Sequence, residues 1–236
     1  MRQVQLIAAN FVREQRWPVL VLMLWIVLFA VLGLIVDLRA AREDVLFVFK
    51  QLAIYGIAFA VFFGASAIHN ERKTRRILAV LSKSVGRAQY ISGLLVGIVI
   101  ATGIYCFAMG VTGSWILQAG GFSRQYLWFL MLCLMLACLL AASVAVLFST
   151  FLNPLFATLC AVLMLATPAV MALQFGSPLG DAIPAYSLIN LLMKASFHQT
   201  SPPPWSLLLL GFTEAILFWL IASWIFSRRD VAVAVD

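Results

Sequence analysis

The sequence predicts an all-α integral membrane protein, and three observations lead to this prediction. Of the 236 residues, 64% are hydrophobic and only 11% are charged, whereas a soluble domain carries about 25% charged residues. The apolar residues gather in long runs that match the ~20 residues a helix needs to cross the hydrocarbon core. Basic residues cluster between these runs. We therefore expect residues 1–236 to form a single transmembrane domain.

Residues 4–12 predict an amphipathic N-terminal helix that lies in the membrane interface. Its apolar residues recur at helical spacing and are Val4, Ile7, Ala8, Phe11 and Val12. Trp17-Pro18 then supplies an interfacial anchor and a helix start. We expect the first span, which follows, to act as an uncleaved anchor.

Six apolar runs follow, and each predicts a membrane-spanning helix. The predicted spans cover residues 18–36, 46–68, 90–113, 126–148, 155–174 and 205–226. Only Ser149 to Pro154 separates the fourth span from the fifth, and the Asn153-Pro154 pair there predicts a helix break. The stretch 176–204 is rich in proline. Within it, Tyr186 to Met193 predicts a short helix that dips into the membrane or rests on it.

The distribution of positive charge predicts the orientation. If the six spans alternate, 11 of the 16 Lys and Arg residues fall on one side. Short loops rich in these residues stay cytoplasmic, so we expect both termini in the cytoplasm of a multi-pass protein of the plasma (bacterial inner) membrane. The basic residues flank apolar runs instead of covering a folded face. They predict contact with lipid headgroups and no binding of nucleic acid.

The motifs of several catalytic and cofactor-binding classes are missing from the sequence. It contains no GxxxxGK[ST] phosphate loop, no HExxH and no GxSxG. The four cysteines fall within apolar runs without a CxxC pair, which predicts neither a metal site nor a disulfide. We expect a chain that is not catalytic and that binds no cofactor itself.

Two features inside the predicted spans indicate helix contacts or function. Glu214 lies near the middle of the last span, where an ionisable residue is a functional candidate. Gly211, one turn earlier, allows another helix to approach closely. Two interpretations stay open: Glu214 lines a substrate path, or it fixes the last span to a neighbour. In the third span, Gly93 and Gly97 form a GxxxG motif, a candidate dimer face.

The segment from Glu71 to Gly93, ERKTRRILAVLSKSVGRAQYISG, lies between the second and third spans. Its bases are Arg72, Lys73, Arg75, Arg76, Lys83 and Arg87. A Lys or Arg at the centre of a membrane helix costs about 2.5 to 3.5 kcal/mol, so this segment must lie outside the hydrocarbon. An apolar cluster at residues 77–81 predicts a short cytoplasmic helix whose stripe packs against headgroups or another protein.

This segment resembles the loop between the second and third spans of type 2 ATP-binding cassette (ABC) permeases, the membrane subunits of ABC exporters. The matching residues follow without a gap and are Glu71, Arg72, Arg75, Ile77, Leu81, Ser82, Lys83, Val85, Arg87, Gln89, Tyr90 and Gly93. Arg76, Ser84 and Leu94 depart from the family pattern, which usually has Thr, Pro and Lys there. The family also has an amphipathic N-terminal helix, six spans and a long outer segment before the last span.

The resemblance implies a permease subunit that exports an unidentified substrate with a separate ATPase subunit. That partner would bind ATP and Mg, and a second permease copy or homologue would complete a dimer. The residues implied in ATPase coupling are Glu71, Arg72, Arg75, Ile77, Leu78, Leu81, Lys83, Arg87 and Tyr90. Glu71 would meet a basic residue of the ATPase, and Leu78 and Leu81 would fill a groove.

An alternative function stays open. A membrane scaffold or assembly factor without transport activity would dock a cytosolic partner through the same residues 71–90. A membrane-embedded enzyme is a third option, but it needs clustered carboxylates or histidines at one depth, and Glu214 stands alone in its span.

Overall fold

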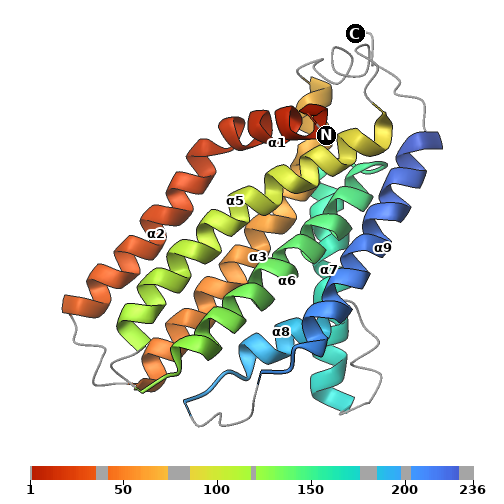
Figure 1. The fold of residues 1–236 in the computed structure, drawn as a ribbon. Coiled ribbons are helices and arrows are strands. Elements are labelled where there is room, and N and C mark those ends of the chain that lie inside the picture. The colour runs from red at the N-terminus through yellow and green to blue at the C-terminus, as the bar shows by residue number, and fades with distance from the viewer. Residues whose placement is uncertain are drawn as a thin grey trace.

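The computed structural model describes residues 2–35, 42–73, 86–117, 121–175, 185–197 and 203–228. Within these ranges, all regular secondary structure is helical, as the sequence predicts. The helices are α1 (Arg2–Glu14), α2 (Arg16–Ile35), α3 (Arg42–Lys73), α5 (Arg87–Ile116), α6 (Arg124–Ser149), α7 (Pro154–Phe175), α8 (Tyr186–Met193) and α9 (Ser206–Arg228). They form one bundle (Figure 1).

Among the described residues, four helices are long and apolar enough to cross a membrane: Glu43–His69 in α3, together with α5, α6 and α9. The predicted spans 46–68, 90–113, 126–148 and 205–226 overlap these four helices. A fifth candidate is the bent pair Gln3–Glu14 and Arg16–Val31. In α7, the part whose side chains are described, Pro154–Ala166, is apolar but shorter than these four helices. The bundle is therefore that of a multi-pass membrane protein with four or five candidate spans.

The helix α6 lies at the centre of the bundle (Figure 1). It packs against α3, α5, α7, α8 and α9, and its residues 141–147 are buried without interruption. At Gly64 of α3, an added Cβ would lie 2.7 Å from the carbonyl oxygen of Ala142 and 2.9 Å from the Cβ of Ala145. Small residues let the backbones of α3 and α6 approach this closely, as in other membrane helix pairs.

By contrast, α2 lies at the edge of the bundle. Among residues 16–31 of α2, only Val19, Leu22 and Ile26 on one face are buried, while most of the large apolar side chains around them are exposed. A helix that is hydrophobic all round requires apolar surroundings on every side. This pattern is typical of a helix that faces lipid on most of its circumference.

The chain bends by 61° between α1 and α2. Pro18 lacks an amide hydrogen and cannot donate to the carbonyl of Glu14, so the helical hydrogen-bond ladder is interrupted there. The predicted break between the fourth and fifth spans is also present, since α6 ends at Ser149 and α7 begins at Pro154. The predicted short helix from Tyr186 to Met193 is confirmed as α8.

The first described helix starts, and the last described helix ends, at the same end of the bundle. Figure 1 shows the start of α1, the end of α3, the start of α5 and the end of α9 together there. The opposite end carries α8 and the start of α6 (Figure 1). The two helices that flank the predicted basic segment therefore meet it beside the start of α1 and the end of α9 (Figure 1).

Candidate functional site

The basic segment begins and ends on two long helices. Helix α3 continues beyond its apolar part to Lys73, so the backbones of Glu71 and Arg72 form its last turn. Helix α5 begins at Arg87 after the N-cap residue Gly86. The other predicted coupling residues, Arg75, Ile77, Leu78, Leu81 and Lys83, lie outside the described residues, as do the side chains of Glu71 and Arg72.

Arg87 contacts the C-terminal end of the last helix. Its Nη1 donates to the carbonyl oxygen of Ser227 at 2.7 Å and to that of Phe226 at 3.4 Å. The last four carbonyls of a helix lack partners within the helix, and a cation is favoured near them. Arg87 therefore caps α9. Its guanidinium, which lies where the basic segment joins α5, is bound to another helix of the same chain.

Tyr90 and Ser92 extend this contact by one turn. The ring of Tyr90 is buried and stacks on Phe226 with a centroid separation of 5.8 Å and an interplanar angle of 21°. The indole Nε1 of Trp219 donates to the hydroxyl of Ser92 at 3.1 Å. We call Arg87, Tyr90, Ser92, Trp219, Phe226 and Ser227 the α5–α9 junction. This junction attaches the start of α5 to the last three turns of α9.

The two glycines of the GxxxG motif hold the N-terminal helix. A Cβ at Gly93 would lie 2.8 Å from Ile7, and one at Gly97 would lie 2.9 Å from Phe11. Ile7 and Phe11 come from the predicted apolar stripe of α1 and are buried. In this structure the GxxxG face is therefore covered by α1 of the same chain instead of serving as a dimer face, because the missing side chains make room for the stripe.

Glu214 and Gly211 both meet α8. The Oε2 of Glu214 accepts a hydrogen bond from the backbone N–H of Ala185 at 3.0 Å. Ala185 is the N-cap residue of α8 and has a left-handed backbone with φ of 64°, which is uncommon for a residue other than glycine. A Cβ at Gly211 would lie 2.5 Å from the Cδ1 of Leu188. The pair therefore fixes α9 against the start of α8, which favours the second interpretation of Glu214.

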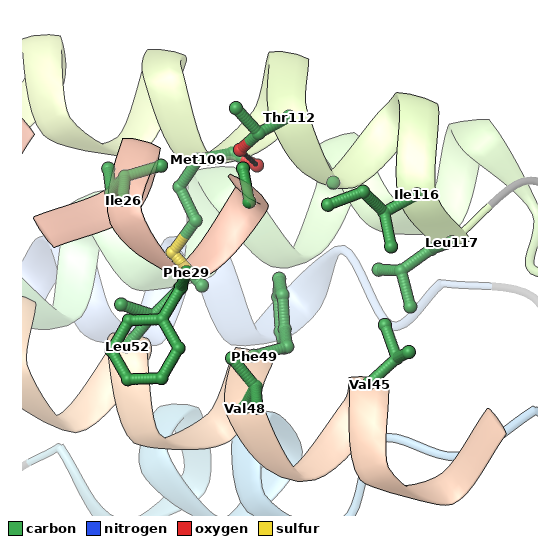
Figure 2. A pocket seen from close by; sticks show the side chains of 12 residues that line it. Ile26, Phe29, Val45, Val48, Phe49, Leu52, Met109, Thr112, Ile116 and Leu117 are labelled. Carbon is green, nitrogen blue, oxygen red and sulfur yellow. Dashed lines mark hydrogen bonds between the residues drawn. The ribbon is translucent and has the colours of Figure 1, made fainter. Parts of the chain in front are cut away.

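An apolar cavity of about 60 Å³ lies between α2, α3 and α5. Figure 2 shows Met109 reaching from α5 toward Phe29 of α2 and Leu52 of α3. The hydroxyl of Thr112, which also lines the cavity, donates to the carbonyl of Ala108 in its own helix at 2.9 Å. The walls are therefore mostly apolar.

The thiol groups and acidic residues do not gather into a metal site in the part of the chain that the structure describes. No group of three His, Cys, Asp or Glu residues there is placed to hold a metal ion. The cysteines are free thiols: Cys106, Cys133 and Cys138 are buried, and Cys160 is half-buried.

Some residues of the α5–α9 junction and of the contact between α8 and α9 were not predicted from the sequence. Trp219 and Phe226 are seven residues apart and therefore share one face of α9, a signal that sequence reasoning can detect. Their partners Ser92 and Tyr90 carry no such signal. Ala185 was missed because it contributes only its backbone.

Comparison of the sequence with known proteins assigns no function, so any functional proposal must rest on the residues of this chain. The sequence matches no protein-family model, and no curated protein is significantly similar to it.

Proposed function

We propose that this chain is the membrane-spanning permease subunit of an ABC exporter, driven by ATP hydrolysis in a separate ATPase subunit. The observation that carries the proposal is the gapless motif from Glu71 to Gly93. An all-helical, multi-pass membrane bundle is compatible with such a subunit. The ATPase would bind ATP and Mg, and a second permease copy or homologue would complete the transporter.

The proposal includes six spans in the plasma (bacterial inner) membrane with both termini in the cytoplasm. Its spans are α2, α3, α5, α6, α7 and α9, which run along the bundle in alternating directions (Figure 1). The charge distribution supports the orientation, because the end of the bundle with the start of α1 and the end of α9 also carries the flanks of the basic segment (Figure 1).

Coupling requires two global states and contacts that differ between them. In the proposed mechanism, the ATPase binds residues 71–90 and moves this segment during the ATP cycle. The segment is continuous with α3 on one side and with α5 on the other, so its movement would reach the membrane through both helices. The α5–α9 junction would pass the same movement to α9. Arg87 and Tyr90 then act through α9, while Glu71, Leu78 and Leu81 make the docking contacts.

The experiment that tests this proposal uses the full chain copurified with its ATPase and reconstituted in lipid. We expect Glu71→Arg or Leu81→Asp to abolish stimulation of the ATPase while membrane insertion stays intact. Glu43→Arg is the matched control, because it reverses an exposed charge at the opposite end of the same helix. Unchanged ATPase stimulation in both docking variants would refute the docking role.

A second measurement separates a transporter from a scaffold. Efflux of substrate from vesicles must depend on this chain and on ATP hydrolysis if the chain is a permease. A scaffold would still bind its partner through residues 71–90. It would support no efflux, so a hydrolysis-deficient ATPase would make no difference to the vesicles.

A further inference from the structure

A groove of about 250 Å³ opens between α2 and α3. Helix α2 packs mainly on α5 and less on α3, which leaves this space between the two helices. We call its lining residues the aromatic groove: Val21, Leu22 and Trp25 of α2 with Tyr55 and Phe59 of α3. Trp25 and Tyr55 are 41% and 38% exposed, so a molecule dissolved in the membrane can reach their rings.

The rings of the aromatic groove are held by contacts with one another and with their neighbours. Those of Trp25 and Tyr55 are 6.4 Å apart between centroids, with an interplanar angle of 74°. Trp25 also meets Phe29 edge-on at 5.3 Å, and Phe59 meets Phe63 edge-on at 6.0 Å. Edge-to-face pairs of this kind are favourable. The groove therefore presents a preformed aromatic surface, which suits a ligand with a flat ring.

Two polar donors lie in the aromatic groove at an unusual depth. Tyr55 is near the middle of the candidate span Glu43–His69, and Trp25 is near the middle of α2. Both residue types are enriched at the membrane–water interface, where their polar tips reach water or headgroups. The centre of a membrane offers neither. The hydroxyl of Tyr55 and the indole Nε1 of Trp25 therefore need acceptors in the protein or in a bound molecule.

The described part of the chain supplies no acceptor for these two donors, because neither Tyr55 nor Trp25 makes a hydrogen bond there. Another tyrosine of the bundle is paired. The hydroxyl of Tyr105 on α5 donates to the carbonyl oxygen of Leu52 on α3 at 2.7 Å. The unpaired donors of the aromatic groove thus point to an occupant that accepts hydrogen bonds.

The apolar cavity between α2, α3 and α5 continues the aromatic groove. Its volume is about 60 Å³, and its lining includes Phe29 of α2 and Leu52 of α3 (Figure 2). Phe29 follows Trp25 by one helical turn, and Leu52 precedes Tyr55 by about one turn. A ligand whose ring lies in the aromatic groove can therefore extend an apolar tail between the same two helices toward this cavity.

We propose that the aromatic groove binds a lipid-soluble quinone, a molecule with a flat ring, carbonyl oxygens and an apolar tail. A carbonyl oxygen accepts from the hydroxyl of Tyr55, the ring packs against Trp25, and the tail runs toward Phe29. A plain hydrocarbon chain would leave both donors unpaired, and a charged group is costly at this depth. The inference concerns binding alone and goes beyond the proposed ATPase coupling, so its test and the ATPase test can fail independently.

The test uses native mass spectrometry of the full chain, released from detergent after incubation with decylubiquinone or with phenyldecane. Phenyldecane has a ring and the same tail but no carbonyl. We expect the wild type to retain one decylubiquinone per chain and to retain phenyldecane about fivefold less, because one hydrogen bond contributes about this factor.

Tyr55→Phe removes only the hydroxyl and keeps the ring. It should lower retention of decylubiquinone about fivefold and leave retention of phenyldecane unchanged, which separates a lost hydrogen bond from a distorted groove. Tyr186→Phe is the matched control, since this tyrosine lies on α8 and does not line the groove. Its retention of decylubiquinone should equal that of the wild type.

A second pair of variants tests the location. Val21→Trp fills the aromatic groove from an exposed position, whereas Leu20→Trp adds the same ring at the neighbouring exposed position, which does not line the groove. Retention of decylubiquinone should fall in Val21→Trp and stay at the level of the wild type in Leu20→Trp.

Equal retention of the two probes by the wild type would overturn the proposal, since an ordinary lipid-facing hollow would not distinguish them. Equal losses in Tyr55→Phe and Tyr186→Phe, or in Val21→Trp and Leu20→Trp, would overturn it as well. A loss of dimer in Val21→Trp with full retention of decylubiquinone would assign the groove to a second copy of the chain instead.

Discussion

The guanidinium of Arg87 lies 2.7 Å from the carbonyl oxygen of Ser227, a residue 140 positions later in the chain. The contact joins the first residue of α5 to the last turn of α9. If residues 71–90 receive a force from a partner, this hydrogen bond connects the end of the segment directly to the last helix.

Arg87→Ala should therefore loosen the end of α9. A hydrogen bond to a charged group contributes about 1.5–3 kcal/mol, and its partial exposure here reduces the effect toward about 1 kcal/mol. We expect faster amide hydrogen exchange in the last two turns of α9. Arg13→Ala, which removes an exposed cation at the same end of the bundle, should leave this exchange unchanged. Equal exchange in both variants would show that Arg87 does not hold α9.

The glycines of α5 provide a matched series for the attachment of α1. Gly97→Ala should destabilise the protein by about 1–3 kcal/mol, because the added methyl overpacks the contact with Phe11. Gly103→Ala on the same helix meets no atom within 4 Å and should be neutral or stabilising by up to about 1 kcal/mol. Thermal unfolding in detergent measures both. A similar loss in the two variants would mean that helix α5 itself, and not its contact with α1, is sensitive.

Glu214 distinguishes a structural carboxyl from a pathway residue. Glu214→Gln keeps an acceptor oxygen for the N–H of Ala185, whereas Glu214→Ala leaves that N–H without it, at a cost of about 1–3 kcal/mol if buried. We expect exchange in α8 to rise in Glu214→Ala and to stay near wild type in Glu214→Gln. If both variants lose transport while α8 is unaffected, the pathway interpretation is correct instead.

Orientation is open to direct measurement. In a background without native cysteines, Ser82→Cys should react with a membrane-impermeant thiol reagent only after the cytoplasmic side is opened. Ser123→Cys, at the exposed start of α6, should react in intact cells. The reverse result would invert the proposed topology and remove the docking segment from the ATPase.

Local signals explain what the sequence could predict. Composition and run length indicate the membrane helices, Pro154 marks the start of α7, and the prolines around Tyr186 to Met193 isolate α8. The amphipathic spacing of Ile7 and Phe11 likewise predicts α1 and its buried face.

The pairing of helices could not be predicted in the same way. Lipid and protein neighbours are equally apolar, so hydrophobicity does not show which face of a membrane helix meets another helix. Gly93 and Gly97 announced a close contact, yet only the three-dimensional arrangement identifies α1 as the partner. The bond from Ala185 to Glu214 depends on a backbone N–H, which every residue except proline possesses, and so it leaves no trace in the sequence.

The seating of α1 on α5 also has a consequence for biosynthesis. Ile7 and Phe11 emerge from the ribosome long before Gly93 and Gly97, so the receptor surface for the first helix does not exist while α2 and α3 are being made. Helix α1 therefore cannot reach its final position until α5 has been made. In a chain whose synthesis stops before Gly97, the apolar stripe of α1 is thus left uncovered. An incomplete chain differs in this exposed stripe from a complete one.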